Sequence, residues 1–362
     1  MSVIQAFEEK LKNTSLRYSI ADDEKPIVPD AQINCIGENK NRMISIMNRL
    51  TKSELGREAL QTAAEKGFSF EFSNAYSACG FTDPGKKRVV LHSDFSDDKL
   101  VGTLCHECRH AGQFSRAPKE MLYRTDWDIQ TTLRHTRAME ADAQAYAVAA
   151  CEQLARQGDI GPKKEFSKNY PEITKGFEES LKKNGNEVNN NVLTDAFKAW
   201  YDQPKLKEVY EKQYLVKRMT DDAGYMMFGL KPSMTFSVSI PAEQTISSIT
   251  VSKNGNYFQD DPAILNGGKY LDVSESTMRK ISGYFNVRKY ALYGDGRTAS
   301  LDGISVRSDV PETSQEDGGA SLSASVQADK IQKIMKNKEA VRQQGNAIKT
   351  AQFRKLSAKR GR

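Results

Sequence analysis

The sequence predicts an α+β protein that is predominantly helical and contains a small sheet. Two short stretches, 68–72 (FSFEF) and 87–92 (KRVVLH), have the alternating or concentrated apolar pattern of strands. Two longer stretches, 96–114 and 125–157, repeat apolar residues at the spacing of amphipathic helices. We therefore expect a strand at 87–92, directly before the first long helix, with the second long helix following it.

The segments before the sheet predict further helices. Residues 1–14 form an amphipathic pattern, and residues 40–66 predict either two helices or one broken helix. Ser53-Glu54 is a suitable helix start inside the second segment, and Gly67 is a suitable stop. The small sheet is therefore expected to follow a helical N-terminal region.

The segments after the second long helix are more mixed. Residues 165–228 predict mainly helices, with breaks near 184–191 and 203–204. Residues 234–240 (MTFSVSI) resemble a strand, and residues 275–285 predict another helix. Helices are therefore expected to outnumber strands throughout the folded part of the chain.

The net charge of +6 at pH 7 comes entirely from the end of the 362-residue chain. Residues 331–362 hold ten Lys and Arg and one acidic residue, which leaves 43 basic and 46 acidic residues for the rest of the chain. Residues 303–328 are rich in Ser, Gly, Asp and Glu, which predicts a flexible linker. The basic tail, with a helical pattern over 326–344, could contact nucleic acid or another anionic partner, or act as an export signal.

The composition also indicates the cellular compartment in which the protein is expected. No apolar run approaches the ~18 residues of a membrane span. The first residues lack the basic start and apolar core of a secretory signal. Five cysteines are an odd and sparse set, which argues against a disulfide scaffold. We therefore expect a cytoplasmic protein with no transmembrane segment, with export as an effector as the alternative.

The segment HECRH at 106–110 is the most informative motif, because it matches the pattern HExxH. Positions four apart on a helix differ by about 40°, so His106 and His110 can both reach one Zn²⁺. Glu107 would then lie beside the metal-bound water and could take its proton. A helical wheel places both histidines, with Gln113, on a polar face opposite the apolar arc. This separation predicts a zinc site.

Two histidines do not hold a catalytic zinc ion, so a third protein ligand is needed. Glu140 and Asp142 in the next long helix are the candidates. Glu140 lies in the middle of an apolar stripe, whereas Asp142 lies about 160° away beside polar residues. A buried carboxylate is costly without a partner, which favours Glu140 as the ligand. Alternatively, Glu140 forms a local ion pair with Arg137, which could equally support it as a ligand.

Other polar residues in the region have less specific patterns. Cys105 and Cys108 form a CxxC pair, but both lie on the apolar arc, which predicts buried structural cysteines. His92 ends a predicted strand, where it either binds substrate or is solvated. His135 is expected on the polar side of its helix. If His135 or a cysteine were a fourth protein ligand, the zinc site would be structural and not catalytic.

The arrangement resembles the gluzincin class of zinc metallopeptidases, in which an HExxH helix is followed by a helix that supplies a glutamate ligand. The connection between His110 and Glu140 is 29 residues long. The phrase EADAQA at 140–145 is similar to the glutamate helix of several bacterial metallopeptidase-like proteins of unknown substrate. The resemblance covers roughly residues 65–160.

The resemblance implies a role for each residue of the motif. His106, His110 and Glu140 would be zinc ligands, and Glu107 would be the general base and acid. In this class an edge strand before the HExxH helix, here 87–92, aligns an extended peptide substrate by strand addition. The implied cofactor is therefore Zn²⁺, and the implied partner is a peptide or protein substrate.

The chain departs from the class at one position. Related signatures often place an Asp four residues after the ligand Glu, where it orients a histidine, but this chain has Gln144 there. Either Gln144 or another residue must orient the histidine. The class also supplies a Tyr, His or Arg to stabilise the developing oxyanion, and the sequence does not choose among four candidates, Tyr146, Tyr201, Tyr210 and Arg134.

We therefore expect zinc-dependent peptide-bond hydrolysis by a metallopeptidase-like domain with a helical extension at 67–302. A helical region at 1–66 precedes it, and a linker at 303–330 and a basic tail at 331–362 follow it. The alternatives are hydrolysis of a non-peptide amide, a non-catalytic zinc-stabilised binding or regulatory protein, and nucleic-acid binding through the tail.

Overall fold

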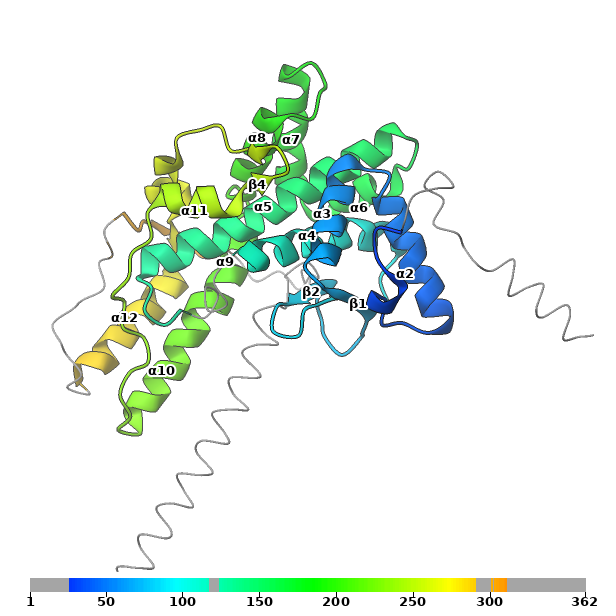
Figure 1. Cartoon of the computed structure of the whole chain (residues 1–362). Helices are drawn as coiled ribbons and strands as arrows, with labels where there is room; N and C mark the ends of the chain where they lie inside the picture. Colours follow the sequence, from blue (N-terminus) through cyan, green and yellow to red (C-terminus); the bar gives the residue numbers. More distant parts are fainter. Residues whose placement is uncertain (1–25, 117–123, 291–300, 302, 311–362) are drawn as a thin grey trace, which may run out of the picture. The chain divides into compact units, whose positions relative to one another are not determined.

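Helices make up most of the described chain, and three small sheets accompany them. The structure, a computed structural model, describes residues 26–116, 124–290, 301 and 303–310 (Figure 1). The predicted α+β, predominantly helical fold class is confirmed. None of the described helices is both long and apolar enough to cross a membrane.

Several predictions concern other residues. The helices predicted at 1–14 and 326–344, and the basic tail at 331–362, lie outside the described residues. The division of the chain into four parts likewise stays a prediction.

Two helices precede the first sheet, as the sequence predicts. They are α2 (Gly37–Leu50) and α3 (Glu54–Glu65). The side chain of Ser53 accepts a hydrogen bond from the backbone N–H of Gly56 at 3.0 Å, which caps α3. Both helices pack against α4, the helix that carries the HECRH motif.

The first sheet has three strands, β1 (Ser69–Phe72), β2 (Gly80–Asp83) and β3 (Arg88–Leu91). Their spatial order is β1-β3-β2, with β3 parallel to β1 and antiparallel to β2. The prediction of an edge strand at 87–92 is therefore wrong, because β3 is the central strand. A continuous apolar run is typical of a strand with neighbours on both sides. The edge strand that contacts the HECRH helix is β2.

The two long helices are α4 (Asp97–Arg116) and α5 (Ile129–Arg156). The side chain of Asp128 caps α5 by accepting a hydrogen bond from the N–H of Thr131 at 2.6 Å. In Figure 1, α5 passes through the middle of the described helices with α4 beside it. Almost every α5 residue up to Leu154 is buried, because other helices cover it on several sides.

A run of helices follows α5, as predicted for 165–228. Breaks occur where the sequence indicated them, and Pro171 and Pro204 start new helices. The run comprises α6 (Gly161–Asn169), α7 (Pro171–Lys183), α8 (Asn190–Trp200), α9 (Pro204–Glu211), a π-helical segment η3 (Lys212–Val216) and α10 (Lys217–Met227).

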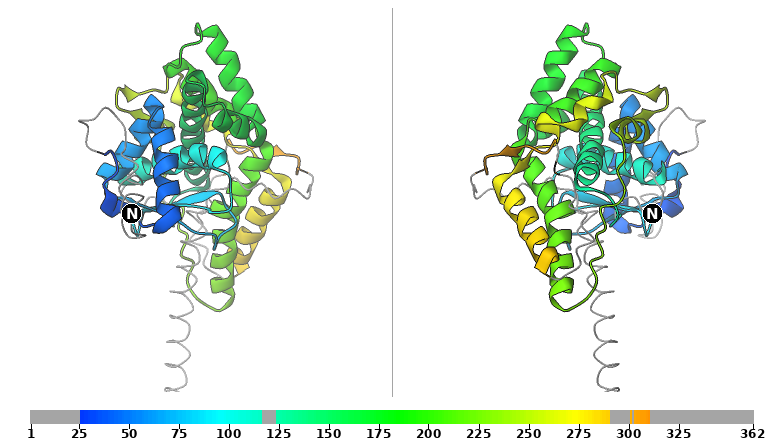
Figure 2. Two further views of the ribbon diagram at one scale, coloured as in Figure 1. Left: turned by 90° about the vertical axis from the view of Figure 1, so that its right-hand side faces the viewer. Right: turned by 90° about the vertical axis from the view of Figure 1, so that its left-hand side faces the viewer.

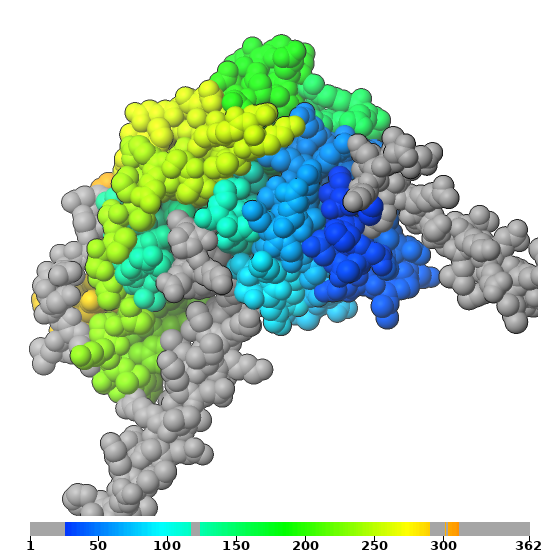
Figure 3. Space-filling view, in the orientation of Figure 1, coloured from blue at the N-terminus to red at the C-terminus, as the bar shows by residue number. Residues whose placement is uncertain are grey.

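The segment 234–240, predicted as a strand, is not one. It makes a single isolated bridge, between Val238 and Trp127, because no neighbouring strand pairs with it in the described residues. After it come α11 (Ala242–Ile249) and the two-stranded sheet of β4 (Val251–Ser252) and β5 (Gly255–Asn256). Lys253 in this hairpin donates to Glu58 of α3 through its backbone N–H. Figure 3 accordingly shows the yellow segment meeting the blue surface of α3.

The end of the described chain packs on α10. Helix α12 (Glu275–Tyr290) lies beside α10, as Figures 1 and 2 show, and it extends beyond the predicted 275–285. Strands β6 (Val273–Ser274) and β7 (Val306–Arg307) pair in parallel. The start of the segment expected to be a linker is therefore a paired strand. The remaining short elements are 3-10 helices, η1 (Asp30–Gln32), η4 (Pro262–Asn266) and η5 (Gly268–Tyr270).

Candidate metal centre

The structure brings together the three side chains predicted as ligands. His106 and His110 lie one turn apart on α4, and Glu140 approaches them from α5. Nε2 of His106 lies 3.0 Å from Nε2 of His110, and these nitrogens lie 3.4 and 3.5 Å from Oε2 of Glu140. Tetrahedral bonds of about 2.1 Å place ligand atoms about 3.4 Å apart. The three atoms therefore fit around one metal ion.

Burial makes a cation necessary at this point. The three residues are at most 5% exposed, although the wheel had placed the histidines on a polar face. That face is covered because α5 packs on it. Oε2 of Glu140 has no hydrogen-bond partner among the described residues. A buried carboxylate oxygen without a partner is costly, and a metal ion bound to His106, His110 and Glu140 removes that cost.

The electrostatics of the site also favour positive charge. Burial opposes charge on His110, but the Glu140 and Glu107 carboxylates raise the pKa of His110 to about 9. Burial would raise the pKa of Glu140, but His110 and His106 hold that pKa below its usual range. Without a metal the site therefore holds a proton, which a metal ion must displace.

Glu107 lies next to the ligands and is anchored by the edge strand. The Thr82 hydroxyl of β2 lies 2.8 Å from both the backbone carbonyl oxygen and Oε2 of Glu107, to which it donates. Burial raises the pKa of Glu107, although His106 and His110 oppose this shift. A carboxylate with a raised pKa is a stronger base, as proton transfer from water requires.

The strand β2 approaches α4 closely because of one glycine. A Cβ atom on Gly80 would lie 2.8 Å from Cγ2 of Thr103 and 3.2 Å from Cγ of Glu107. Any larger residue at this position would push β2 away from α4. Gly80 therefore determines how near the edge strand comes to Glu107.

A pocket opens beside the ligands. It is lined by Gly80 from β2, His106 and Glu107 from α4, Gln144 from α5, and Tyr170 from the junction of α6 and α7. The Tyr170 phenol hydrogen-bonds to the Gln144 side chain and lies near the carboxylates of Glu140 and Glu107. Tyr170 was not among the oxyanion candidates. Its only sequence signal is a position just before a helix-starting proline, which does not point to a site.

A different glutamine, Gln113, makes the hydrogen bond to a histidine that the sequence analysis had suggested for Gln144. Oε1 of Gln113 lies 2.7 Å from Nδ1 of His110, one turn further along α4. Nε2 of Gln113 donates to Oδ2 of Asp142 at 2.5 Å and to the carbonyl oxygen of Met139 at 3.0 Å. The wheel position of Gln113 on the histidine face was the signal for this role.

Asp142, the alternative ligand, is outside the metal-capable group. It is fully buried and forms a two-point ion pair with Arg109, with N···O distances of 2.7 and 2.9 Å. The hydroxyl of Tyr257 donates to it at 2.8 Å. Asp142 therefore lies behind the site, where it holds Gln113.

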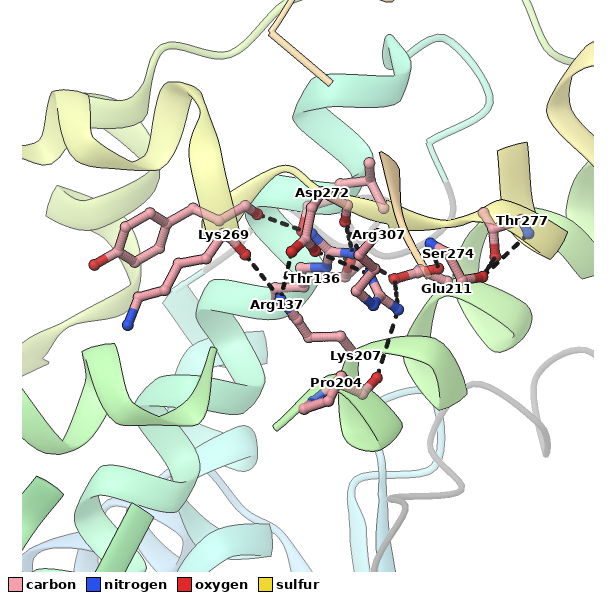
Figure 4. Close-up of polar contacts among 12 residues, drawn as sticks. Thr136, Arg137, Pro204, Lys207, Glu211, Lys269, Asp272, Ser274, Thr277 and Arg307 are labelled. Carbon is pink, nitrogen blue, oxygen red and sulfur yellow. Dashed lines mark hydrogen bonds and ion pairs between the residues drawn. The ribbon is translucent and has the colours of Figure 1, made fainter. Parts of the chain in front are cut away.

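Arg137 does not pair with Glu140. The structure therefore differs from both hypotheses about Arg137, namely a local ion pair with Glu140 and support of Glu140 as a ligand. This arginine belongs to a second buried group, the ion cluster of Arg137, Lys207, Glu211, Asp272 and Arg307 (Figure 4). Arg137 and Arg307 both approach Oε1 of Glu211 at 2.7 Å. Lys207 and Arg307 pair with Asp272 at 2.8 and 2.9 Å. Arg137 is thus paired away from the metal ligand.

The remaining predicted residues lie elsewhere. Cys105 and Cys108 are buried and free, as predicted. His135 is also buried, so the prediction of a polar position for it is wrong: Trp127 packs edge-on against its ring. His92 is half-buried against Phe95 at the end of β3. In the described residues no fourth His, Cys, Asp or Glu joins the three ligands.

Three of the four oxyanion candidates lie away from the ligands, and the fourth lies beside Glu140. Tyr146 donates to Glu58, and Arg134 donates to the carbonyl oxygen of Ile240. Tyr201 packs against Trp200. These three make their contacts away from the ligands. The fourth, Tyr210, is buried near Glu140 and Tyr170, and burial and the Glu140 carboxylate raise the pKa of its phenol. It stacks on Tyr214, whose hydroxyl lies 3.5 Å from Oε1 of Glu140.

A family model described as "Putative metallopeptidase family" (DUF6782) matches residues 28–223. The chain belongs to this family. The match contains α4, α5 and all three candidate ligands, and it ends within α10. No curated protein and no solved structure matches the chain. The putative metallopeptidase family therefore supports a metal-dependent hydrolase in general, and the geometry supplies the residues.

Proposed function

We propose that this member of the putative metallopeptidase family is a zinc-dependent peptidase. The observation that carries the proposal is the convergence of His106, His110 and Glu140 on one point, with Glu107 beside them. Two imidazoles and one carboxylate are a donor set that suits zinc. Three protein ligands leave one coordination position open, as catalytic zinc sites do.

Glu107 acts as the general base and then the general acid. When bound, zinc supplies the Lewis acidity that lowers the pKa of water toward about 7 and polarises a carbonyl group. Glu107 takes the proton of the attacking water and delivers it to the leaving amine. Thr82 holds one carboxylate oxygen of Glu107, which limits the rotation of the group during both transfers.

Tyr170 stabilises the negative charge that develops on the carbonyl oxygen. Burial raises the pKa of its phenol, so the hydroxyl keeps its proton at neutral pH. It shares the pocket with Glu107 and His106, and a neutral donor there can hydrogen-bond to the oxyanion. A Tyr170→Phe variant should retain the metal and lose about 10²-fold or more in kcat.

The first experiment is elemental analysis of protein purified without added zinc. About one zinc ion per chain is expected in the wild type, and none in Glu140→Ala. Absence of zinc from the wild type, even after reconstitution, would refute the zinc centre.

The second experiment separates the chemistry from metal binding. Glu107→Gln should keep its zinc and lose about 10²- to 10⁴-fold in turnover of a fluorogenic peptide library. Glu152→Gln is the matched control, because it removes a buried carboxylate from the neighbouring helix α5, where the partners of Glu152 are Arg156 and Lys163. Full activity of Glu107→Gln would contradict the mechanism. Turnover of small amides but not of peptides would assign the same chemistry to a non-peptide substrate.

A further inference from the structure

The contacts behind His110 assign a function to residues that neither the motif nor the family model marks. We propose that Gln113 and Asp142 are positioning residues that hold His110 in the tautomer whose Nε2 is free to bind metal. The inference rests on the proposed zinc site. It concerns this chain's own hydrogen bonds, which can be tested apart from catalysis.

The orientation of the Gln113 amide follows from its neighbours. One end of the amide faces two groups that only accept hydrogen bonds, the Asp142 carboxylate and the Met139 carbonyl oxygen. The NH₂ group must therefore occupy this end. The carbonyl oxygen then faces His110, and Nδ1 of His110 must carry the proton that this oxygen accepts.

This proton position determines what the other ring nitrogen can do. A neutral imidazole carries one proton, so a proton on Nδ1 leaves a lone pair on Nε2. Nε2 is the atom of His110 that lies 3.0 Å from His106 and 3.5 Å from Glu140, where the metal would bind. Gln113 therefore selects Nε2 as the ring nitrogen of His110 that binds the metal once the ring has lost its second proton.

Asp142 is itself held rigidly. It accepts hydrogen bonds from Arg109, Gln113 and Tyr257, all of which are at most 5% exposed. The guanidinium of Arg109 also lies over the Tyr146 ring, 3.8 Å from its centroid. Because the carboxylate is paired with a buried cation, it stays in place to receive the NH₂ group of Gln113.

The two histidine ligands therefore differ in the hydrogen bonding of their Nδ1 atoms. Nδ1 of His106 has no hydrogen-bond partner among the described residues, whereas Nδ1 of His110 is bonded to Gln113. Tyr257 lies beyond the family match, which ends at residue 223. The hydrogen bonds behind His110 thus connect the matched region to the hairpin region that follows it.

The test uses the full-length protein and three variants. Gln113→Met keeps the shape of the side chain and removes both hydrogen bonds. Gln113→Glu, with one proton, can still accept from His110 and donate to Asp142. Gln153→Ala is the matched control, because Gln153 lies on the neighbouring helix α5 and its side chain bonds to Ser53 and the Leu55 N–H instead of to His110 or Asp142.

Zinc affinity is measured by competition with a chromophoric chelator, and folding is checked by thermal denaturation. Gln113→Met should weaken zinc binding about 10- to 100-fold. Gln113→Glu should lie closer to the wild type, and Gln153→Ala should match it. A purely structural role would instead weaken the Gln113 and Gln153 variants in step with their loss of stability, and that result would overturn the proposal.

The tautomer is read directly by ¹⁵N–¹H correlation of the histidine side chains, which is practical because the chain has only four histidines. We expect a proton on Nδ1 of His110 in the zinc-loaded wild type. We expect the same in the metal-free protein once the ring is neutral, a state that the shifts of the two ring nitrogens report directly. Gln113→Met should lose this preference in the metal-free protein. An unchanged tautomer in that variant would refute the proposal, whatever the activity of the enzyme.

Discussion

Arg137 and Glu140 lie one turn apart on α5, and each belongs to a buried cluster of charged groups. The ion cluster around Arg137 contains three cations and two carboxylates, all paired with one another within the chain. The metal centre around Glu140 contains two carboxylates and two imidazoles, and Oε2 of Glu140 has no hydrogen-bond partner in the described residues. The comparison teaches that charged groups can be paired with one another inside the chain, whereas a cluster with converging lone pairs has the donor arrangement that suits a bound cation.

The largest effect is expected at the metal centre. Glu140→Gln removes the anionic ligand, so zinc content should fall from about one per chain to near zero. The variant should still fold, because the lost carboxylate was not paired with a Lys or Arg side chain. Elemental analysis and thermal denaturation with and without a chelator measure the two effects. In the wild type the chelator should lower Tm, and in Glu140→Gln it should have no effect.

A Glu-to-Gln substitution in the ion cluster should have the opposite effect, because it should lower stability and leave zinc binding unchanged. Glu211→Gln removes the carboxylate that pairs with the buried Arg137, which should cost about 3–5 kcal/mol of unfolding free energy. Zinc should still bind, because no ligand has changed. Chemical denaturation measures the loss. Equal stability of Glu211→Gln and wild type would contradict the assignment of this cluster to the fold.

A third buried group on α5, His135, sharpens the comparison, because its Nδ1 has no hydrogen-bond partner in the described part of the chain. Burial lowers the pKa of His135 to about 4. The unfolded chain therefore binds a proton near pH 6.5 that the folded chain does not bind until about pH 4. Stability should be complete above pH 6.5 and fall by up to about 3 kcal/mol as the pH drops to 4. His135→Phe should lack this difference, and denaturation midpoints measured across the window for both proteins test it.

The smallest effect is expected where charges face solvent. Lys40 pairs with Asp30 at 2.7 Å, but the Asp30 side chain is 71% exposed. Lys40→Ala should therefore change the unfolding free energy by less than about 1 kcal/mol. A loss as large as that of Glu211→Gln would show that burial does not explain the difference between the clusters.

Local patterns predicted the elements near the site well. Ser53 caps a helix as predicted, and the HECRH spacing places two histidines on one helical face, but the strand β2 beside Glu107 was not predicted. The central position of β3 was missed, because strand order depends on pairing partners that a single segment does not reveal. The segment 234–240 was misjudged for the same reason, since it has a strand-like composition but no partner strand.

The sequence alone determined the residues that converge on the metal position. The i, i+4 spacing of His106 and His110 and the apolar surroundings of Glu140 are local properties of two helices. Only the tertiary structure decided which other residues contact these three side chains or their neighbours. Gln113, Tyr170, Asp142 and the partners of Arg137 acquire their roles from contacts between elements that lie up to 170 residues apart, as Arg307 and Arg137 do. Helical periodicity specifies which face a side chain occupies, but the neighbour that covers that face is set by packing.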